Sequence, residues 1–372
     1  MNSKKLEFNT FLIYFIAVLC FVCIRICSYY NCFAFMGQYA SYYVSIIVQV
    51  GIIFLLPLLL FKKMNKIKYK ETFDFYGFKK ISFKCIVLAV ILGVVLFVLN
   101  TFVANFFYSI IESLGYKSHS SGGAVGATWW TLVLNIICTA VLPAICEETL
   151  HRGMLLRGIS RLGAKRAILI SGLLFGLLHM NIEQFFYATL IGFFFGYIAF
   201  GTDSIYPTII LHFMNNALST FMQFARVKGW AIGSVFSNFM KALSTNRFLG
   251  FVVMLLVLVL LFIFLFSLSR AIIFDCFKRD FDKQQKIITD NAIRASYFQQ
   301  VTQIVEGNLN ETRPQRVVID AKEFLEYLKQ SIKEEEIEEQ QNELDYRAKI
   351  FMLGSIALTL IITILTFIWG LL

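Results

Sequence analysis

Two adjacent carboxylates, Glu147 and Glu148, are the first residues of this chain that could do chemistry. They follow an apolar stretch that is long enough to enter a membrane. Two later apolar stretches carry one histidine each, His179 and His212. Ionisable side chains at membrane depth are costly and usually functional. Their presence on three separate stretches predicts one buried polar site, suited to activating water and hydrolysing an acyl bond.

The spacing gives the two glutamates different roles. Arg152 follows Glu148 by four residues, so a helix would pair the two side chains and compensate the charge of the arginine inside the membrane. Glu148 and Arg152 are therefore expected to support the site. Glu147 keeps a like-charged neighbour and an apolar setting, which suit it to act as a general base near neutral pH. His179 and His212 could hold or polarise a water molecule.

Counting along the expected helices places these residues at similar depths. At 1.5 Å per residue, Glu147 lies about 15 Å from the interface, His212 about 13 Å and His179 about 20 Å. Asn216 lies one turn beyond His212 on the same helix face, so it can share the site and donate to an oxyanion.

The composition is that of a membrane protein. Of the 372 residues, 58% are hydrophobic, and the mean hydropathy is +0.69. We expect an all-α fold: a polytopic transmembrane helical bundle of about 8–9 spans, with a helical cytoplasmic insert before the last span. The expected spans lie near residues 11–30, 42–61, 85–107, 130–156, 168–180, 185–200, 205–224, 249–274 and 350–369.

The same pattern predicts five regions along the chain. They are N-terminal transmembrane helices (1–125), a catalytic transmembrane core (126–226), a further transmembrane helix (227–276), a polar cytoplasmic insert (277–348) and a C-terminal transmembrane helix (349–372). The insert carries an acidic run at 333–339 and an apolar stripe of Phe324, Leu328 and Ile332. Charge runs are usually solvated faces, so a helical hairpin that only connects two spans is favoured over a module that binds a cytoplasmic partner.

The distribution of Lys and Arg predicts the orientation. They gather in the connections at 62–84 and 157–166 and after the eighth span, which should therefore be cytoplasmic. The N-terminus would then be cytoplasmic, although the connection at 224–249, expected outside, also carries cations. The net charge of +10 is explained by this orientation and by anionic lipid, without nucleic acid. A bacterial plasma membrane fits the chain best.

Metal and cofactor sites are not expected. Most of the eight cysteines fall within apolar helices, where a thiol behaves as a small hydrophobe. A zinc protease is disfavoured because no His-Glu-x-x-His occurs, and a serine protease because no Gly-x-Ser-x-Gly occurs. A proton-coupled transporter stays open, because buried Glu and His also form proton relays. Transporters often show internal symmetry between halves, which this sequence does not.

Three motifs occur in order between residues 129 and 224: Glu147-Glu148-x-x-x-Arg152, Phe175-x-x-x-His179 and His212-x-x-x-Asn216. Together they resemble the signature of the CAAX-protease and bacteriocin-processing family of intramembrane glutamic endopeptidases, also called the abortive-infection family. The segment from 277 onward has no counterpart in that family.

The resemblance implies an intramembrane endopeptidase. Glu147 would activate water with help from His179, while His212 and Asn216 would stabilise the oxyanion. Glu148 with Arg152 would support the site. Relatives act on membrane-associated peptides or prenylated tails, and their helical core opens toward the cytoplasm. Some relatives resemble bacteriocin-immunity or scaffold proteins without proteolytic activity, so that alternative also stays open.

Overall fold

The computed structural model describes residues 3–118, 128–245, 247–305 and 344–371 of the chain. These residues form helices and no strand. Contacts divide the chain into one unit of Met1–Ile273 with Glu343–Leu372 and a second unit of Phe274–Asn342. Every candidate site residue lies in the first unit.

Seven helical segments of the described residues are long and apolar enough to cross a membrane. They are Ser3–Tyr29 (α1), Ala34–Asn65 (η1 to α3), Phe83–Ser113 (α5), Trp129–Leu156 (α6 to η4), Ile182–Thr202 (α9), Phe248–Lys286 (within α12) and Tyr346–Leu371 (α14). The expectation of a polytopic helical bundle is confirmed.

Two further expected spans also form helices. Helix α8 (Ala164–Leu178) has 15 residues, which is short for a full crossing. Helix α10 (Tyr206–Val227) has 22 residues but carries His212, Asn215 and Asn216 in its middle.

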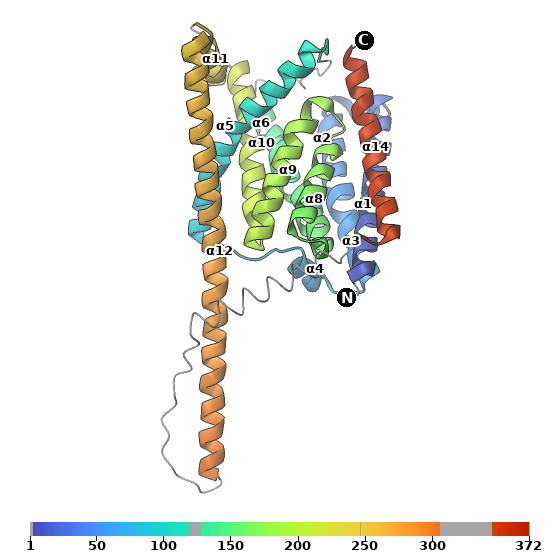
Figure 1. Ribbon diagram of the computed structural model, residues 1–372. Helices are drawn as coiled ribbons and strands as arrows, with labels where there is room; N and C mark the ends of the chain where they lie inside the picture. The colour runs from blue at the N-terminus through green and yellow to red at the C-terminus, as the bar shows by residue number, and fades with distance from the viewer. Residues whose placement is uncertain (1–2, 119–127, 246, 306–343, 372) are drawn as a thin grey trace. The chain divides into compact units, whose positions relative to one another are not determined.

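Ion pairs and hydrogen bonds join connections at the end of the bundle where the chain begins. Arg161 Nε lies 2.7 Å from Glu7 Oε1, and Arg157 Nη1 lies 2.7 Å from Asp203. Lys79 also pairs with Asp203. We call this the N-terminal end, and it carries the short helix α4 (Tyr69–Phe75). In Figure 1 it is the lower end of the first unit.

Different connections meet at the opposite end. The Tyr116 hydroxyl donates to Glu183 Oε1 at 3.0 Å, and the Ile182 amide donates to Thr366 Oγ1 at 3.2 Å. Trp230, just before η6 (Ala231–Ser234) and α11 (Val235–Thr245), packs on Trp129. The C-terminus lies at this end in Figure 1.

Three segments of π-helix interrupt the spans, and all of them carry residues of the candidate site. They are Ile47–Leu55 (η2), Ile137–Val141 (η3) and Thr149–Leu156 (η4). Leu56–Asn65 (α3) and Leu142–Glu148 (α7), which follow the first two, each have a proline in their first turn. Proline has no N–H for the carbonyl four residues earlier. Such irregular turns are frequent at functional sites.

The second unit was expected to be a polar helical hairpin. Helix α12 (Arg247–Val305) continues through its first part as far as Val305. The apolar stripe of Phe324, Leu328 and Ile332 and the acidic run at 333–339 lie outside the described residues. The expected region boundaries and the partner role of this insert stay predictions.

Candidate active site

Phe175 on α8 joins the residues of the three motifs. Its ring centroid lies 5.1 Å from that of His151, 5.2 Å from His179 and 5.7 Å from His212, all in edge-on geometry. The Arg152 guanidinium carbon lies 4.4 Å from the same centroid. Stacking on an aromatic face stabilises a desolvated cation. One buried ring thus fixes the mutual positions of groups from η4, α8 and α10.

Glu148 lies on the fully packed side of the site. Arg152 Nη1 donates to Glu148 Oε1 at 2.9 Å, and the side chains of both residues are 0% exposed. Arg152 Nη2 donates to the Gly192 carbonyl at 3.0 Å. The predicted pair therefore forms, and it ties α7 and η4 to α9.

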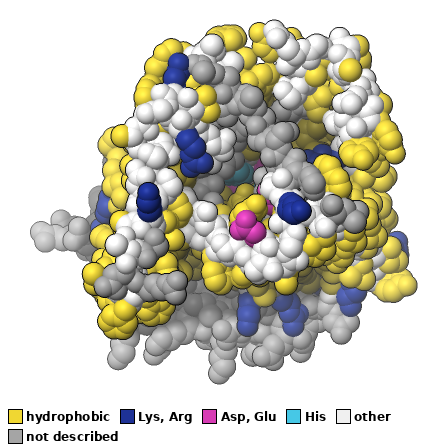
Figure 2. All heavy atoms as spheres, turned by 90° about the horizontal axis from the view of Figure 1, so that it is seen from above, with side chains coloured by type: hydrophobic (Ala, Val, Ile, Leu, Met, Phe, Trp, Pro, Cys, Tyr) yellow, Lys and Arg dark blue, Asp and Glu magenta, His cyan; other side chains and the backbone are white. Residues whose placement is uncertain are grey.

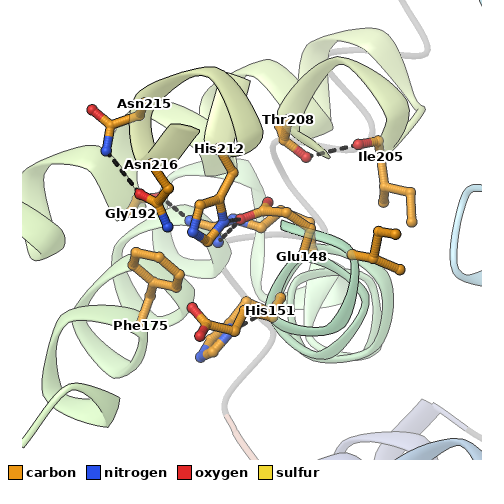
Figure 3. A network of polar contacts seen from close by, with 12 residues as sticks. Glu148, His151, Phe175, Gly192, Ile205, Thr208, His212, Asn215 and Asn216 are labelled. Atoms are coloured by element: carbon orange, nitrogen blue, oxygen red, sulfur yellow. Dashed lines mark hydrogen bonds and ion pairs between the residues drawn. The ribbon is translucent and has the colours of Figure 1, made fainter. Parts of the chain in front are cut away.

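His212 shares the same carboxylate oxygen. Its Nδ1 lies 2.8 Å from Glu148 Oε1, and its ring lies between Asn216 and Glu148 in Figure 3. A carboxylate accepts hydrogen bonds, so Nδ1 carries the proton and Nε2 is left for another group.

Glu147 faces the other way, into a cavity. Its Oε1 accepts a hydrogen bond of 2.8 Å from Gln49 Nε2, on η2. Successive residues of a helix point about 100° apart, since a turn takes 3.6 residues. Glu147 is therefore only half-buried beside a fully buried Glu148.

His179, at the end of α8, lines the same cavity as Glu147. Its Nδ1 lies 3.0 Å from the Phe175 carbonyl, which can only accept. The proton is therefore on Nδ1, and Nε2 is the nitrogen that can accept or relay a proton.

Asn216 donates to a backbone carbonyl that lacks its usual α-helical N–H partner. Pro143 has no N–H to offer the Thr139 carbonyl four residues earlier. Asn216 Nδ2 donates to that carbonyl at 2.9 Å, and Asn215 Nδ2 donates to Asn216 Oδ1 at 3.0 Å. One N–H of the Asn216 amide stays available as a donor.

These groups surround a cavity of about 770 Å³. Glu147, His179, His212 and Asn216 all line it, whereas Glu148 and Arg152 lie behind the wall. A second cavity of about 140 Å³ adjoins Glu147 and His179 and is bordered by Gln49 and Arg25. The structure thus brings together all six predicted residues and separates them into a cavity-facing set and a packed set.

Sequence reasoning assigned no role to four residues of this site. Gln49 contacts Glu147, and Phe175 was noted only as part of a motif. His151 Nδ1 lies 2.9 Å from the Glu147 carbonyl, and the Tyr14 hydroxyl lies 3.3 Å from His151 Nε2. Gln49, His151 and Tyr14 are polar side chains within apolar stretches, and this pattern could have pointed to them in the sequence.

The arrangement suits water activation. A half-buried carboxylate and an imidazole nitrogen share one cavity with an amide donor and a histidine backed by a carboxylate. In the described residues no group of three His, Cys, Asp or Glu side chains is arranged to hold a metal ion.

Residues 128–218 match a known sequence family, described as Rce1-like, type II CAAX prenyl endopeptidase Rce1-like. This segment is 91 of the 372 residues and contains all six predicted site residues. The curated proteins and the solved structures contain no match to the chain. Over this segment the chain is similar to that family, which supports the resemblance of the three motifs to the CAAX-protease and bacteriocin-processing family.

Proposed function

We propose that the protein is an intramembrane endopeptidase that hydrolyses peptide bonds of membrane-associated or lipidated peptides with water activated by Glu147. The observation that carries this proposal is the position of Glu147. It is the one carboxylate on the wall of the large cavity among the described residues, and it shares that wall with His179, His212 and Asn216.

In the first step Glu147 accepts a proton from water as the oxygen attacks the peptide carbonyl carbon. Gln49 holds one oxygen of the carboxylate, so the other oxygen is free to take the proton. His179, with its proton on Nδ1, offers Nε2 as a second acceptor that orients the attacking water.

The charge that develops on the carbonyl oxygen needs donors. The second N–H of Asn216 can supply one, and Nε2 of His212, whose Nδ1 is held by Glu148, can supply another when it carries a proton. The tetrahedral intermediate collapses when the proton held by Glu147 passes to the leaving amine nitrogen. The C–N bond then breaks.

The test is cleavage of peptides from membrane proteins by purified protein, measured by mass spectrometry, for the wild type and Glu147→Gln. General-base catalysis is worth about 10²–10⁴-fold, so we expect the variant to lose at least that factor. The wild-type activity should persist with a metal chelator. Wild-type turnover by Glu147→Gln would refute the mechanism, and chelator-sensitive cleavage would make the histidines metal ligands.

We place the protein in a plasma membrane, most consistent with a bacterial cell, with its N-terminus in the cytoplasm. The support is the distribution of Lys and Arg along the chain.

A further inference from the structure

Two cysteines lie on either side of the turn that ends α1. Cys27 is in the last turn of the helix and is half-buried, and Cys32 follows the helix and is exposed. Both thiols are free. The proposed hydrolysis of peptides uses neither of them, so their closeness calls for a separate explanation.

This turn reaches the surface of the membrane. Helix α1 has 27 residues and is therefore about 40 Å long at 1.5 Å per residue. The hydrocarbon core of a bilayer is only about 30 Å thick. Lys4 and Lys5 stand at the start of the helix, so its last turn extends to the interface on the other side. Water and small water-soluble reagents have access to the two thiols there.

The backbone brings the two cysteines together. Asn31 has a positive φ of 55°, the left-handed conformation that ends many helices. The Cys32 N–H donates to the Cys27 carbonyl at 2.9 Å. The Asn31 N–H donates to the Ser28 carbonyl at 3.0 Å. These two bonds form a Schellman motif, in which Cys27 and Cys32 occupy the two positions whose side chains commonly touch.

The distance between the two residues fits a disulfide. A carbonyl oxygen lies about 2.4 Å from its own Cα, and an amide nitrogen about 1.5 Å from its own. With the hydrogen bond of 2.9 Å between them, the Cα atoms of Cys27 and Cys32 are at most about 6.8 Å apart. Disulfides join Cα atoms that are about 4.4–6.8 Å apart. The two thiol groups also interact with each other directly.

Cys23 is a third thiol nearby, but its position does not suit a disulfide. It precedes Cys27 by four residues on the same face of α1. The Cβ atoms of such residues lie about 5–6 Å apart in a helix, whereas a disulfide needs about 3.5–4.5 Å. Cys27 is therefore expected to pair with Cys32, and Cys23 serves as a matched control.

The turn leads into the wall of the large cavity. After Cys32 the chain forms η1 (Ala34–Tyr39) and α2 (Ala40–Ile46), whose Gln38 and Tyr42 line that cavity. Figure 2 looks onto the first unit from the end opposite to the N-terminus and shows histidine atoms inside a hollow. A covalent bond across the turn would restrain this connection where it leaves α1.

We propose that Cys27 and Cys32 are a modification site that closes an intramolecular disulfide across the end of α1, with a small-molecule disulfide as the oxidant. The thiolate of the exposed Cys32 attacks one sulfur of the reagent and releases one thiol. The thiolate of Cys27 then attacks the Cys32 sulfur of the mixed disulfide and releases the second thiol. The two protein thiols lose two protons and two electrons, and the reagent takes up both to become two thiols.

Differential alkylation tests the pairing. Purified protein is exposed to oxidised glutathione, free thiols are blocked with a maleimide, and the cysteines are mapped by mass spectrometry before and after reduction. We expect Cys27 and Cys32 to lose reactivity together without added glutathione mass, and to regain it on reduction. Cys23→Ser should behave like the wild type. Wild-type Cys27 and Cys32 that stay free or each carry glutathione, or a disulfide between Cys27 and Cys23, would overturn the proposal.

The role of the turn is tested at Asn31. Asn31→Gly keeps a residue that adopts positive φ readily, whereas Asn31→Val places a β-branched side chain where positive φ is strongly disfavoured. We expect Asn31→Gly to close the disulfide at the wild-type rate and Asn31→Val to close it several times more slowly. Equal rates in the two variants would refute the role of the turn in presenting the pair.

Thermal unfolding tests the restraint. A disulfide stabilises a protein mainly by constraining the unfolded chain. The oxidised wild type should therefore melt at a higher temperature than the reduced wild type, and Cys32→Ser should melt at the same temperature after either treatment. Closure of the disulfide without a rise in melting temperature would refute the restraint.

Discussion

Glu147 and Glu148 are neighbours in the chain, but their surroundings differ completely. Glu148 is fully buried and bound to Arg152 and His212. Glu147 receives one hydrogen bond from Gln49 and borders two cavities. A buried ion pair with every charge compensated is a poor source of reactivity, whereas a half-buried carboxylate at a cavity can exchange a proton. The comparison teaches that one residue along a helix separates a carboxylate in a packed ion pair from a carboxylate on a cavity wall.

The largest expected effect on stability comes from breaking the packed side. Arg152→Leu removes the cation that compensates Glu148 and leaves that carboxylate buried without its main partner. Breaking one member of a buried pair costs about 3–5 kcal/mol. We expect a much lower yield and a lower melting temperature in detergent. If the variant melts at the wild-type temperature, the supporting role assigned to Arg152 is refuted.

On the cavity side, Asn216→Ala should reduce catalysis more than stability. Loss of one oxyanion donor costs about 10²–10³-fold in kcat. The control is Asn215→Ala, which removes a neighbouring amide of the same network but no donor to the oxyanion. Equal loss of kcat in both variants would show that the network, and not the Asn216 donor, matters.

A smaller effect is expected at Gln49, which holds Glu147 without touching the substrate. Gln49→Leu keeps the approximate size and removes the hydrogen bond to the carboxylate. We expect roughly a tenfold loss of kcat, corresponding to about 1.4 kcal/mol. The pH profile of kcat should also shift, because the environment of the base changes. A purely structural role would lower the melting temperature and leave the pH profile in place.

The smallest effect is expected at the N-terminal end of the bundle, where Asp203 pairs with Arg157 and Lys79. Burial would raise the pKa of Asp203, but hydrogen bonds and attraction from Lys79 and Arg157 lower it overall. The stabilisation is therefore present above the ordinary pKa of an aspartate and is lost as the pH falls through the lowered value.

Asp203→Asn tests this contribution. The residue has a positive φ of 49°, which asparagine also tolerates, so the backbone is kept. A half-exposed pair is worth about 1 kcal/mol or less. The melting temperature should fall slightly near neutral pH and match the wild type at low pH. A fall as large as that of Arg152→Leu would contradict the contrast between exposed and buried pairs.

Local spacing predicted the parts of the site that depend on one helix. The Glu148–Arg152 pair and the shared wall position of His212 and Asn216 follow from residues four apart. The apolar stretches likewise predicted the helical bundle.

Contacts between distant segments could not be read from the sequence. Gln49 reaches Glu147 across 98 positions, and Tyr14 reaches His151 across 137. The hydrogen bond from Asn216 to the Thr139 carbonyl likewise needs the packing of α10 against η3.

Thermal unfolding and peptide cleavage by Glu147→Gln and Glu148→Gln, measured side by side on the same purified samples, test the central contrast most directly. Both substitutions remove one charge and keep the size. We predict that Glu147→Gln melts at the wild-type temperature without cleaving peptide, and that Glu148→Gln melts at a clearly lower temperature. Equal melting temperatures for the two variants, or a stable Glu148→Gln beside an unstable Glu147→Gln, would contradict the account.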